Sequence, residues 1–502
     1  MAGSGLDGAS GITLRQRIGL WLGPLLALAL QLVPLPALLI EMTGSVGGAR
    51  EAWIVLSLVM LMAVWWICEA LPIPVTSLLP LIILPLFGVQ SMKATSAEYM
   101  HPIVVLLLGG FIVAKAVERW DLHARIALNI VARVGARPTM LIGGFMAAGA
   151  LLSMWISNTA TSIMMMPIAL SVATAIRGPD RIAAPFTYAL LLGIAYSCSI
   201  GGLGTPVGTP TNLIVIGYLN ESAGFSIGFG QWMMIGLPTV LIMVPLAWLV
   251  LTRISFRLAD HESGAGKDAI LSQLEALGPI RVPEIRTLIV FGVVACLWVF
   301  REPLSSLKMG GSLPFAGLTD HLIAIFGVVL CFLVPAGAKN QPGARLLDWP
   351  TAESIPWGVL LLFGGGMTLA AAITQSGLGA WAGAELAGLA ALPILLVIIV
   401  LTALVIFATE VTSNIATAAA LMPVLGAVAL STGMPVELLG LPLALSASCA
   451  FMLPMATGPN AVVFATGHVS LPTMARAGFV LNLLGIAVIS ALSYGLAGRV
   501  LG

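Results

Sequence analysis

The stretch Ser157-Asn158-Thr159-Ala160-Thr161 decides the fold, because a near copy of it returns as Ser413-Asn414-Ile415-Ala416-Thr417. Each copy lies near the middle of an apolar stretch, at 138–176 and 391–433, that is too long for one simple membrane crossing. A polar tip in such a stretch predicts a hairpin that enters and leaves on one side of a membrane. Its non-helical backbone is tolerated at that depth only where protein covers it or where it lines a water-filled cavity.

The two tips belong to a longer internal repeat. Leu106-Leu107-Leu108-Gly109-Gly110 precedes the first tip, and Leu360-Leu361-Leu362-Phe363-Gly364-Gly365 precedes the second. Thr209-Pro210-Thr211-Asn212 and Thr457-Gly458-Pro459-Asn460 follow them in the same order. The apolar segment at 101–117 is expected to run inward and its counterpart at 357–375 outward, so the halves are inverted copies. Inverted repeats with broken helices and a binding site near the midplane are typical of secondary transporters.

Composition agrees with a membrane protein. Of 502 residues, 59% are hydrophobic and 9% charged, and the mean hydropathy is +1.06, whereas soluble domains carry about 25% charged residues. The net charge of +1 gives no reason to expect nucleic acid. We predict an all-α polytopic membrane protein with about 11 transmembrane segments plus two re-entrant hairpins. The segments are expected near 19–40, 52–68, 71–88, 101–117, 185–219, 230–252, 285–300, 320–336, 357–375, 438–467 and 474–497.

Basic residues orient this topology. Placing the N-terminus in the cytoplasm and the C-terminus outside puts sixteen of the 22 Lys and Arg residues inside, as the positive-inside rule requires for a protein of the cell membrane. Residues 118–137 combine spaced arginines with aliphatic residues, a pattern typical of an interfacial amphipathic arm. The polar loop near 256–284 is expected to be a cytoplasmic linker.

The chemistry at the tips and breaks favours an anion bound together with cations. Ser, Thr and Asn offer donors and acceptors at helix ends, where the helix dipole stabilises a carboxylate. Unwound backbone at Gly208-Thr209-Pro210 and Ala456-Thr457 frees carbonyl oxygens that suit a hard cation. Residues 138–176, 185–219 and 438–467 contain no charged residue. A dianion in low dielectric is costly without compensation, so co-bound cations are the simplest solution.

The same residues allow other interpretations. A single Ser-Asn pair in a membrane helix usually makes an interhelical hydrogen bond, but two copies at inverted positions favour a ligand site. Glu410, the only acid in 386–436, is either a functional group or a hydrogen-bonded supporting carboxyl. An ion channel also uses broken helices and carbonyls, yet no filter repeat is recognisable. The hairpins and breaks hold no catalytic dyad or phosphate loop, so neither an enzyme nor a resident cofactor is expected.

With these residues the chain resembles the divalent anion:sodium symporter family, which includes sodium–dicarboxylate, sodium–citrate and sodium–sulfate cotransporters. The resemblance covers nearly all of the chain after about residue 50. Its most specific parts are the tips and breaks quoted above, together with Glu69-Ala70-Leu71-Pro72, Glu410-Val411-Thr412 and Phe451–Ala461.

The resemblance implies an elevator mechanism in a homodimer, with a moving transport domain against a fixed scaffold. The cytoplasmic N-terminus would be 1–18, and 19–137 would hold scaffold helices and the first arm. Residues 138–255 and 391–497 would be the two halves of the transport domain. The cytoplasmic loop would be 256–284, and 285–390 would hold further scaffold helices and a second arm at 376–390.

The resemblance also implies two sodium sites and one anion site. The predicted ligands of the first sodium ion are Ser153, Ser157, Asn158 and the Gly208 carbonyl, and those of the second are Thr409, Thr412, Asn414 and the Ala456 carbonyl. The predicted contacts of a small dianionic substrate are Ser157, Asn158, Thr159, Thr209, Pro210, Ser413, Asn414 and Thr457.

The function expected from the resemblance is sodium symport of C4-dicarboxylates such as succinate, with sodium as a co-transported ion. Alternatives within the fold are a sulfate or citrate carrier and a sodium-independent dicarboxylate exchanger. Ile415 stands where many dicarboxylate-type relatives carry threonine, and Gly458 where a proline is common. A basic residue beside the site would favour exchange, and none is expected there.

Overall fold

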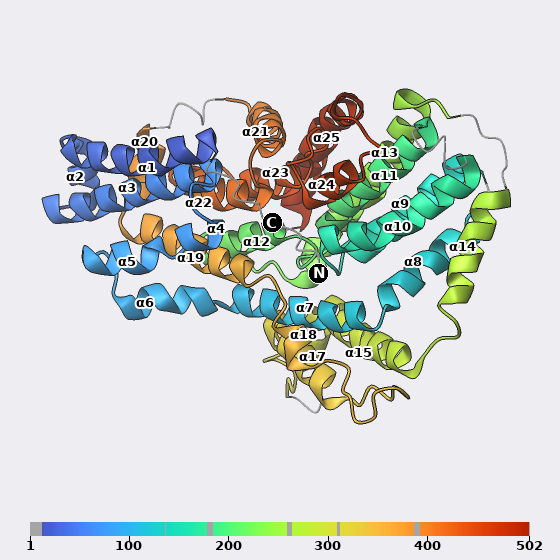
Figure 1. The fold of residues 1–502 in the computed structure, drawn as a ribbon. Helices are drawn as coiled ribbons and strands as arrows, with labels where there is room; N and C mark the ends of the chain where they lie inside the picture. The colour runs from blue at the N-terminus through green and yellow to red at the C-terminus, as the bar shows by residue number, and fades with distance from the viewer. Residues whose placement is uncertain are drawn as a thin grey trace, which may run out of the picture.

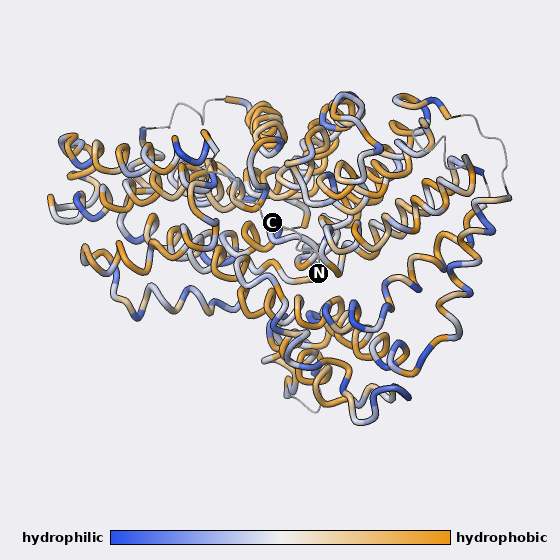
Figure 2. Tube along the Cα trace, viewed as in Figure 1, coloured by the Kyte–Doolittle hydropathy of each residue, from blue (hydrophilic) through white to orange (hydrophobic). Residues whose placement is uncertain are grey.

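The computed structural model describes residues 13–135, 137–177, 184–258, 264–308, 312–385 and 392–500. Across these ranges the chain is helical, with one isolated β-bridge between Pro335 and Arg345. Figure 1 shows long helices packed side by side around a centre formed by the broken helices. Figure 2 shows that these helices are apolar over most of their length.

Helices α1, α2, α3, α5 and α6 lie at one end of the molecule in Figure 1, and α7 and α8 lead from there under the centre to the other side. The span expected at 19–40 is two helices, α1 and α2, bent by 82° at the break between them. Pro34 and Pro36 stand in that break, where proline lacks an N–H and disfavours helix in the preceding residue. The helices of this part are α1 (Leu14–Leu32), α2 (Ala37–Thr43), α3 (Val46–Cys68), α4 (Ile73–Thr76), α5 (Leu79–Leu86), α6 (Met92–Ala97), η1 (Glu98–Met100), α7 (Pro102–Arg119) and α8 (Leu122–Arg133).

Both expected hairpins and both expected breaks are present. In the first half these are α9 (Pro138–Ser153), α10 (Asn158–Arg177), α11 (Pro185–Gly201), η3 (Gly202–Gly204) and α12 (Pro210–Ser222), followed by α13 (Phe229–Leu249) and a π-helical turn η4 (Val250–Ser255). In the second half they are α21 (Ile394–Thr409), α22 (Asn414–Thr432), α23 (Glu437–Ala447), α24 (Gly458–Ala465) and α25 (Leu471–Val500).

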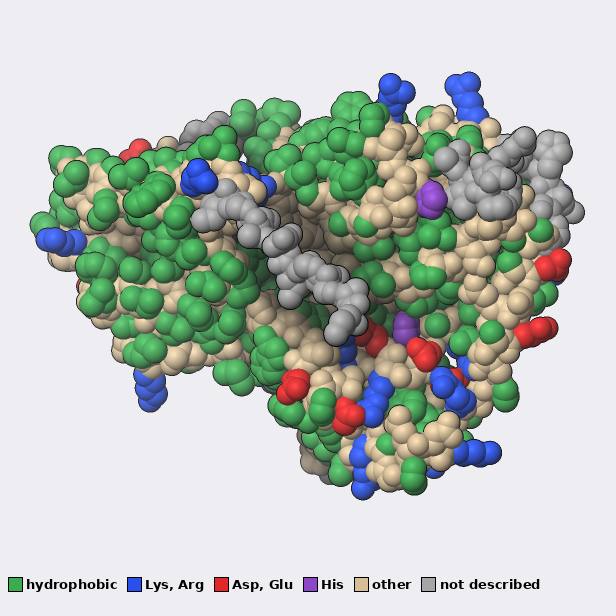
Figure 3. Space-filling view, viewed as in Figure 1, with side chains coloured by type: hydrophobic (Ala, Val, Ile, Leu, Met, Phe, Trp, Pro, Cys, Tyr) green, Lys and Arg blue, Asp and Glu red, His purple; other side chains and the backbone are tan. Residues whose placement is uncertain are grey.

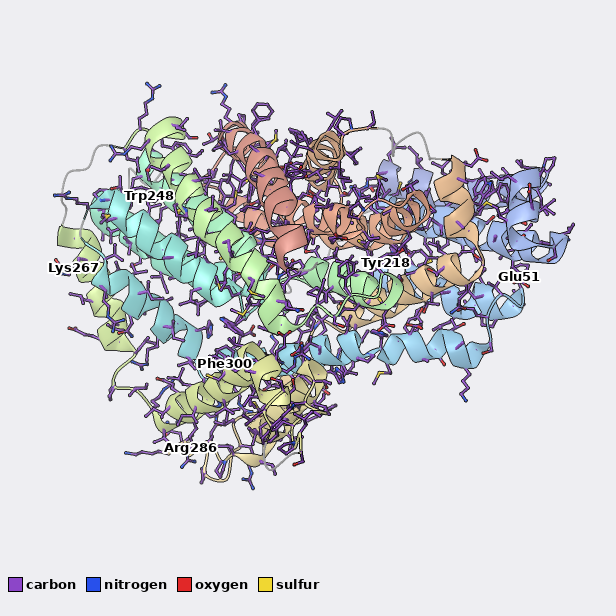
Figure 4. All side chains as sticks on the ribbon, turned by 180° about the vertical axis from the view of Figure 1, so that it is seen from behind. Glu51, Tyr218, Trp248, Lys267, Arg286 and Phe300 are labelled. Atoms are coloured by element: carbon purple, nitrogen blue, oxygen red, sulfur yellow. The ribbon has the colours of Figure 1, made fainter. Side chains whose placement is uncertain are left out.

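The two halves pack against each other through these elements. Helices α10 and α11 contact α24, and α12 contacts α22 and α23. At Tyr218, labelled in Figure 4, the approach of α12 to α22 is so close that a Cβ on Gly426 would collide with the ring. Trp248 on α13, also labelled there, donates its indole N–H to the Thr139 carbonyl of α9 at 2.8 Å. The centre of the molecule is therefore built jointly by both repeats.

The predicted linker at 256–284 contains a helix, so that expectation was wrong. Helix α14 (Gly264–Ala276), which carries Lys267 of Figure 4, packs on α8 and α10. Its Ile270 is fully buried, which gives the helix an apolar contact that a solvated linker lacks. The remaining helices are α15 (Val282–Val299), α16 (Arg301–Ser305), α17 (Asp320–Leu333), α18 (Trp349–Ala352), α19 (Trp357–Gln375) and α20 (Leu378–Glu385). The predicted second arm at 376–390 is described only as far as Glu385.

Within the described ranges, nine helices are long and apolar enough to cross a membrane, or ten if α1 and α2 form one bent span. The segments expected at 71–88, 320–336 and 438–467 contain shorter apolar helices. Large aliphatic side chains such as Leu28, Leu241 and Leu404 are more than half exposed, as lipid-facing residues are. On the face in Figure 3, hydrophobic side chains cover the upper part, and charged side chains gather lower down around α15, α17 and α18.

Candidate functional site

A cavity of about 440 Å³ lies where the hairpin tips and helix breaks of both repeats meet α7 and the start of α19. The first tip and break supply residues 155 and 157–160 and residues 207–210 of its wall, and the second supply residues 414–415 and 457–459. Helix α7 contributes Gly110, Phe111, Ala114, Lys115 and Glu118. The cavity is thus lined by sequences from both halves of the chain that the repeat pairs with one another.

The structure brings all of the predicted substrate residues to this wall except one. Ser157, Asn158 and Thr159 come from the first hairpin, and the others on the wall are Thr209, Pro210, Asn414 and Thr457. Ser413 caps α22 instead, where its hydroxyl accepts from the Ala416 N–H at 3.5 Å. Hydroxyl and amide groups at helix N-termini can stabilise a carboxylate without a formal positive charge.

The first predicted cation set forms a compact cluster. The Ser153 hydroxyl donates to Asn158 Oδ1 and is 2.7 Å from the Cys198 carbonyl. A Cβ added to Gly202 would lie 2.7 Å from Asn158 Oδ1 and 3.1 Å from the Gly208 carbonyl oxygen. One side-chain oxygen and one backbone oxygen therefore lie close to one point beside Gly202, with the Asn158 amide nitrogen 2.9 Å from the same point. Oxygens of these two kinds are the ligands that hard cations prefer. Ser157 stands one residue before Asn158, on the cavity wall.

The second predicted cation set is held differently. The Thr409 hydroxyl donates to the Val405 and Ile406 carbonyls at 2.9 and 3.1 Å, and the Thr412 hydroxyl donates to the Ala408 carbonyl at 2.8 Å. Asn414 Oδ1 accepts from the Ile415 N–H at 3.1 Å. In the described part of the chain, these hydrogen bonds stay within the second hairpin and do not reach Ala456 in the α23–α24 break.

Asparagines hold both helix breaks in the same way. The Asn212 amide donates to the Gly202 and Thr205 carbonyls at 3.0 and 2.8 Å. The Asn460 amide donates to the Ala450 and Leu453 carbonyls at 3.2 and 3.0 Å. In each half the amide thus satisfies carbonyls that the interrupted helix leaves without a helical partner. The repeat predicts that these residues correspond, but it does not reveal this bracing role.

Glu410, whose role the sequence left open, supports the second break. Its carboxylate accepts from the backbone N–H groups of Phe451, Met452 and Leu453 at 2.8–3.1 Å. The Asn482 amide donates to it at 2.7 Å, and the residue is 4% exposed. Hydrogen bonds to an ionised carboxylate are stronger than those between neutral groups, so these four donors hold the end of α21 firmly to the second break. The structure therefore supports the interpretation of Glu410 as a hydrogen-bonded supporting carboxyl.

Comparison with known proteins identifies the family. A family model described as the sodium:sulfate symporter transmembrane region matches residues 23–501. The chain belongs to the sodium:sulfate symporter family. This membership confirms the prediction of a sodium-coupled anion symporter, and it groups the chain with transporters and not with enzymes.

Curated relatives of this symporter cover almost all of it. A sodium-dependent dicarboxylate transporter of Staphylococcus saprophyticus is 41% identical over 493 residues, which is 97% of this chain and 92% of the relative. The protein of the same name from Staphylococcus aureus strain USA300 is 39% identical over 494 residues, with the same shares covered.

A solved structure supports the fold. The crystal structure of the YdaH transporter of Alcanivorax borkumensis superposes with a TM-score of 0.57, at 14% sequence identity. The match covers 90% of this chain and 98% of that one. At this identity the likeness concerns the fold alone, and it agrees with the predicted all-helical transporter architecture.

The structure corrects one expectation about the symporter's cavity and adds one contact that the sequence did not predict. Lys115 on α7 lines the cavity, so the expectation that no basic residue stands beside the site was wrong. Gly458 has a specific neighbour: a Cβ there would collide with the Thr159 hydroxyl of the first hairpin. This contact between the halves leaves no room for a side chain at position 458 unless Thr159 moves.

Proposed function

We propose that this symporter carries C4-dicarboxylates such as succinate into the cell together with sodium ions. The observation that carries the proposal is the pairing of uncharged polar groups at the hairpin tips and helix breaks with the Asn158 and Gly208 oxygens beside Gly202. The tips and breaks offer neutral donors to a dianion, and the two oxygens suit a cation that would offset its charge. The two staphylococcal relatives, named as sodium-dependent dicarboxylate transporters, support the choice of substrate.

The proposed mechanism is an elevator. The hairpins, α11, α12, α23 and α24 would move as a transport domain, while α7, α15, α17 and α19 stay fixed, in a homodimer. With the N-terminus inside, the C-terminal half of α7 lies toward the cytoplasm. The cavity, which that half of α7 lines, would then open inward. Asn158, Thr159, Asn414 and Thr457 would bind the anion, and the two predicted cation sets would bind sodium.

The test is uptake of labelled succinate into proteoliposomes under an inward sodium gradient, with a potassium gradient as control. We expect saturable accumulation that requires sodium. Equal uptake with both cations, seen only when the vesicles are preloaded with dicarboxylate, would establish exchange instead of symport. No succinate uptake under any of these conditions, with sodium-driven uptake of labelled sulfate or citrate, would overturn the substrate assignment.

A further inference from the structure

Two charged residues stand on the cavity wall that is otherwise uncharged. Among the described residues that line it, Lys115 and Glu118 alone carry charge, and both belong to α7. Their side chains form an ion pair with 2.7 Å between Lys115 Nζ and Glu118 Oε2. They are 25% and 22% exposed, so water reaches them. The pair therefore faces the space through which a bound anion would pass.

The inverted repeat shows that the fold itself does not need this pair. When the two halves are aligned on Gly109-Gly110 and Gly364-Gly365, Lys115 corresponds to Ala370 and Glu118 to Ile373. Ala370 and its neighbours on α19 border an apolar pocket of only about 20 Å³ against α12 and α22. The charged pair thus occurs on α7, which faces the open cavity. Apolar residues replace it at the corresponding positions of α19, which packs closely against α12 and α22.

The pair is well suited to exchange partners. A partly exposed ion pair contributes only about 0–1 kcal/mol, so the lysine can leave Glu118 for another carboxylate at little cost. An ammonium–carboxylate hydrogen bond to a bound anion is comparable in strength. Glu118, one helical turn away, competes for the ammonium and limits how tightly a passing anion is held.

We propose that Lys115 is a second anion contact of this symporter, on the α7 wall opposite the uncharged tips and breaks. Lys115 receives one carboxylate of the dianion as the anion enters or leaves those groups. Glu118 takes the ammonium back when the anion departs. The inference rests on the proposed function, and it adds to that function a residue that sets affinity and release.

The decisive experiment compares Lys115→Gln with Glu118→Gln in sodium-driven uptake of labelled succinate. Lys115→Gln removes the contact, and we expect the apparent KM to rise about fivefold, the upper end of what a partly exposed ion pair contributes. Glu118→Gln removes the competitor, so KM should fall while the maximal rate also falls, because the anion leaves more slowly. Lys115→Arg keeps the charge and should keep KM within about twofold.

A purely structural pair makes a different prediction. Both glutamine variants break the same ion pair, so a structural role would shift their kinetics in the same direction or not at all. Either result would overturn the proposal. Lys93→Gln on α6, an exposed lysine away from the cavity, is the matched control and should behave as wild type. If Lys115→Gln does not fold, Glu118→Gln and Lys115→Arg still test the proposal. The proposal requires Glu118→Gln to show a lower KM and a lower maximal rate, and Lys115→Arg to keep the wild-type KM.

The wild-type protein separates this inference from the proposed function. Wild-type succinate uptake, combined with parallel shifts in the two glutamine variants, overturns only the role of Lys115. If wild-type protein carries sulfate or citrate and not succinate, the substrate assignment fails. In that case KM for the anion that is carried should still rise in Lys115→Gln and fall in Glu118→Gln. If these opposite shifts are absent, the role of Lys115 is overturned as well.

Discussion

At the scale of single residues, the two tip asparagines have the same sequence context but different contacts. Asn158 accepts from the Ser153 hydroxyl of its own hairpin and lies close to Gly202 in the first break, whereas Asn414 accepts only from the N–H of the next residue, Ile415, among the hydrogen bonds of the described residues. Both line the cavity. We predict that Asn158→Ala and Asn414→Ala each abolish sodium-driven uptake while expression stays intact. Asn129→Ala on α8, whose amide bonds the Arg125 carbonyl, is the control. Wild-type uptake by both tip variants would refute the site assignment.

A substitution at Gly202 tests the predicted cation site without replacing any of its predicted ligands. Its absent side chain leaves room beside Asn158 Oδ1 and the Gly208 carbonyl, and a Cβ at 2.7 Å from the first of these is too close. We predict that Gly202→Ala raises the sodium concentration for half-maximal uptake at least about tenfold, because ligand displacement impairs a geometry-dependent site. Gly292→Ala on α15, where a Cβ meets open space, should leave it unchanged. An unaltered sodium dependence in Gly202→Ala would place the cation elsewhere.

The sequence predicts the tips and breaks well because the repeat marks them twice. It could not predict that Lys115 faces them, since α7 precedes the first tip by many residues and only tertiary packing brings its wall to the cavity. The role of Glu410 was equally undecidable, because it depends on three backbone N–H groups in Phe451–Leu453. Those donors become available only through the way the second break is folded.

At the scale of elements, Glu410 ties the end of α21 to the α23–α24 break. Glu410→Gln keeps one acceptor oxygen but turns an NH₂ group toward backbone donors. We predict a lower midpoint of thermal unfolding in detergent, which corresponds to a loss of about 2–4 kcal/mol in the free energy of unfolding. Glu437→Gln, in the first turn of α23, should cost less than about 1 kcal/mol through the helix dipole. Unchanged thermal stability with lost uptake would show instead that Glu410 acts on the transported ions.

Helix α8, in the predicted first arm, is anchored by an ion pair that the sequence did not predict. Arg125 on α8 donates to Glu284 on α15 at 2.6 Å and to the Gly278 carbonyl at 3.0 Å, and the Glu284 side chain is 1% exposed. Glu284 also accepts from Arg281 at 2.5 Å, and without Glu284 the Arg125 guanidinium keeps only backbone carbonyls such as those of Leu277 and Gly278. We predict that Glu284→Ala destabilises the protein by about 3 kcal/mol in detergent unfolding, the lower end of the cost of breaking a buried pair. Glu69→Ala, which breaks an exposed pair with Arg15 at 3.8 Å, should cost under about 1 kcal/mol.

Errors in predicting elements came from effects that hydropathy does not record. The apolar run at 19–40 predicts one span but not the 82° bend within it, where two prolines stand. The polar run at 256–284 predicts a linker, but a few buried side chains such as Ile270 suffice to dock α14. Hydropathy measures the average of a window, whereas each of these outcomes depends on a few residues within it.

At the scale of the whole molecule, the elevator proposal requires the α11–α12 break to slide along α7. A close approach between these elements is at Gly110, where a Cβ would lie 3.5 Å from Val207 Cβ. Disulfides need a Cβ···Cβ separation of about 3.5–4.5 Å, so cysteines at 110 and 207 can be joined in this arrangement. We predict that oxidation of the Gly110→Cys/Val207→Cys protein stops succinate uptake and that reduction restores it.

The single variants Gly110→Cys and Val207→Cys distinguish a locked domain from an altered cavity wall, and both should transport in oxidising and reducing conditions alike. Stalled uptake only in the oxidised double variant means that α7 and the break must separate during each cycle. Full uptake by protein shown to be cross-linked would mean that they travel together. The dividing line between fixed and moving parts would then lie outside α7, and the wall that carries Lys115 would move with the anion.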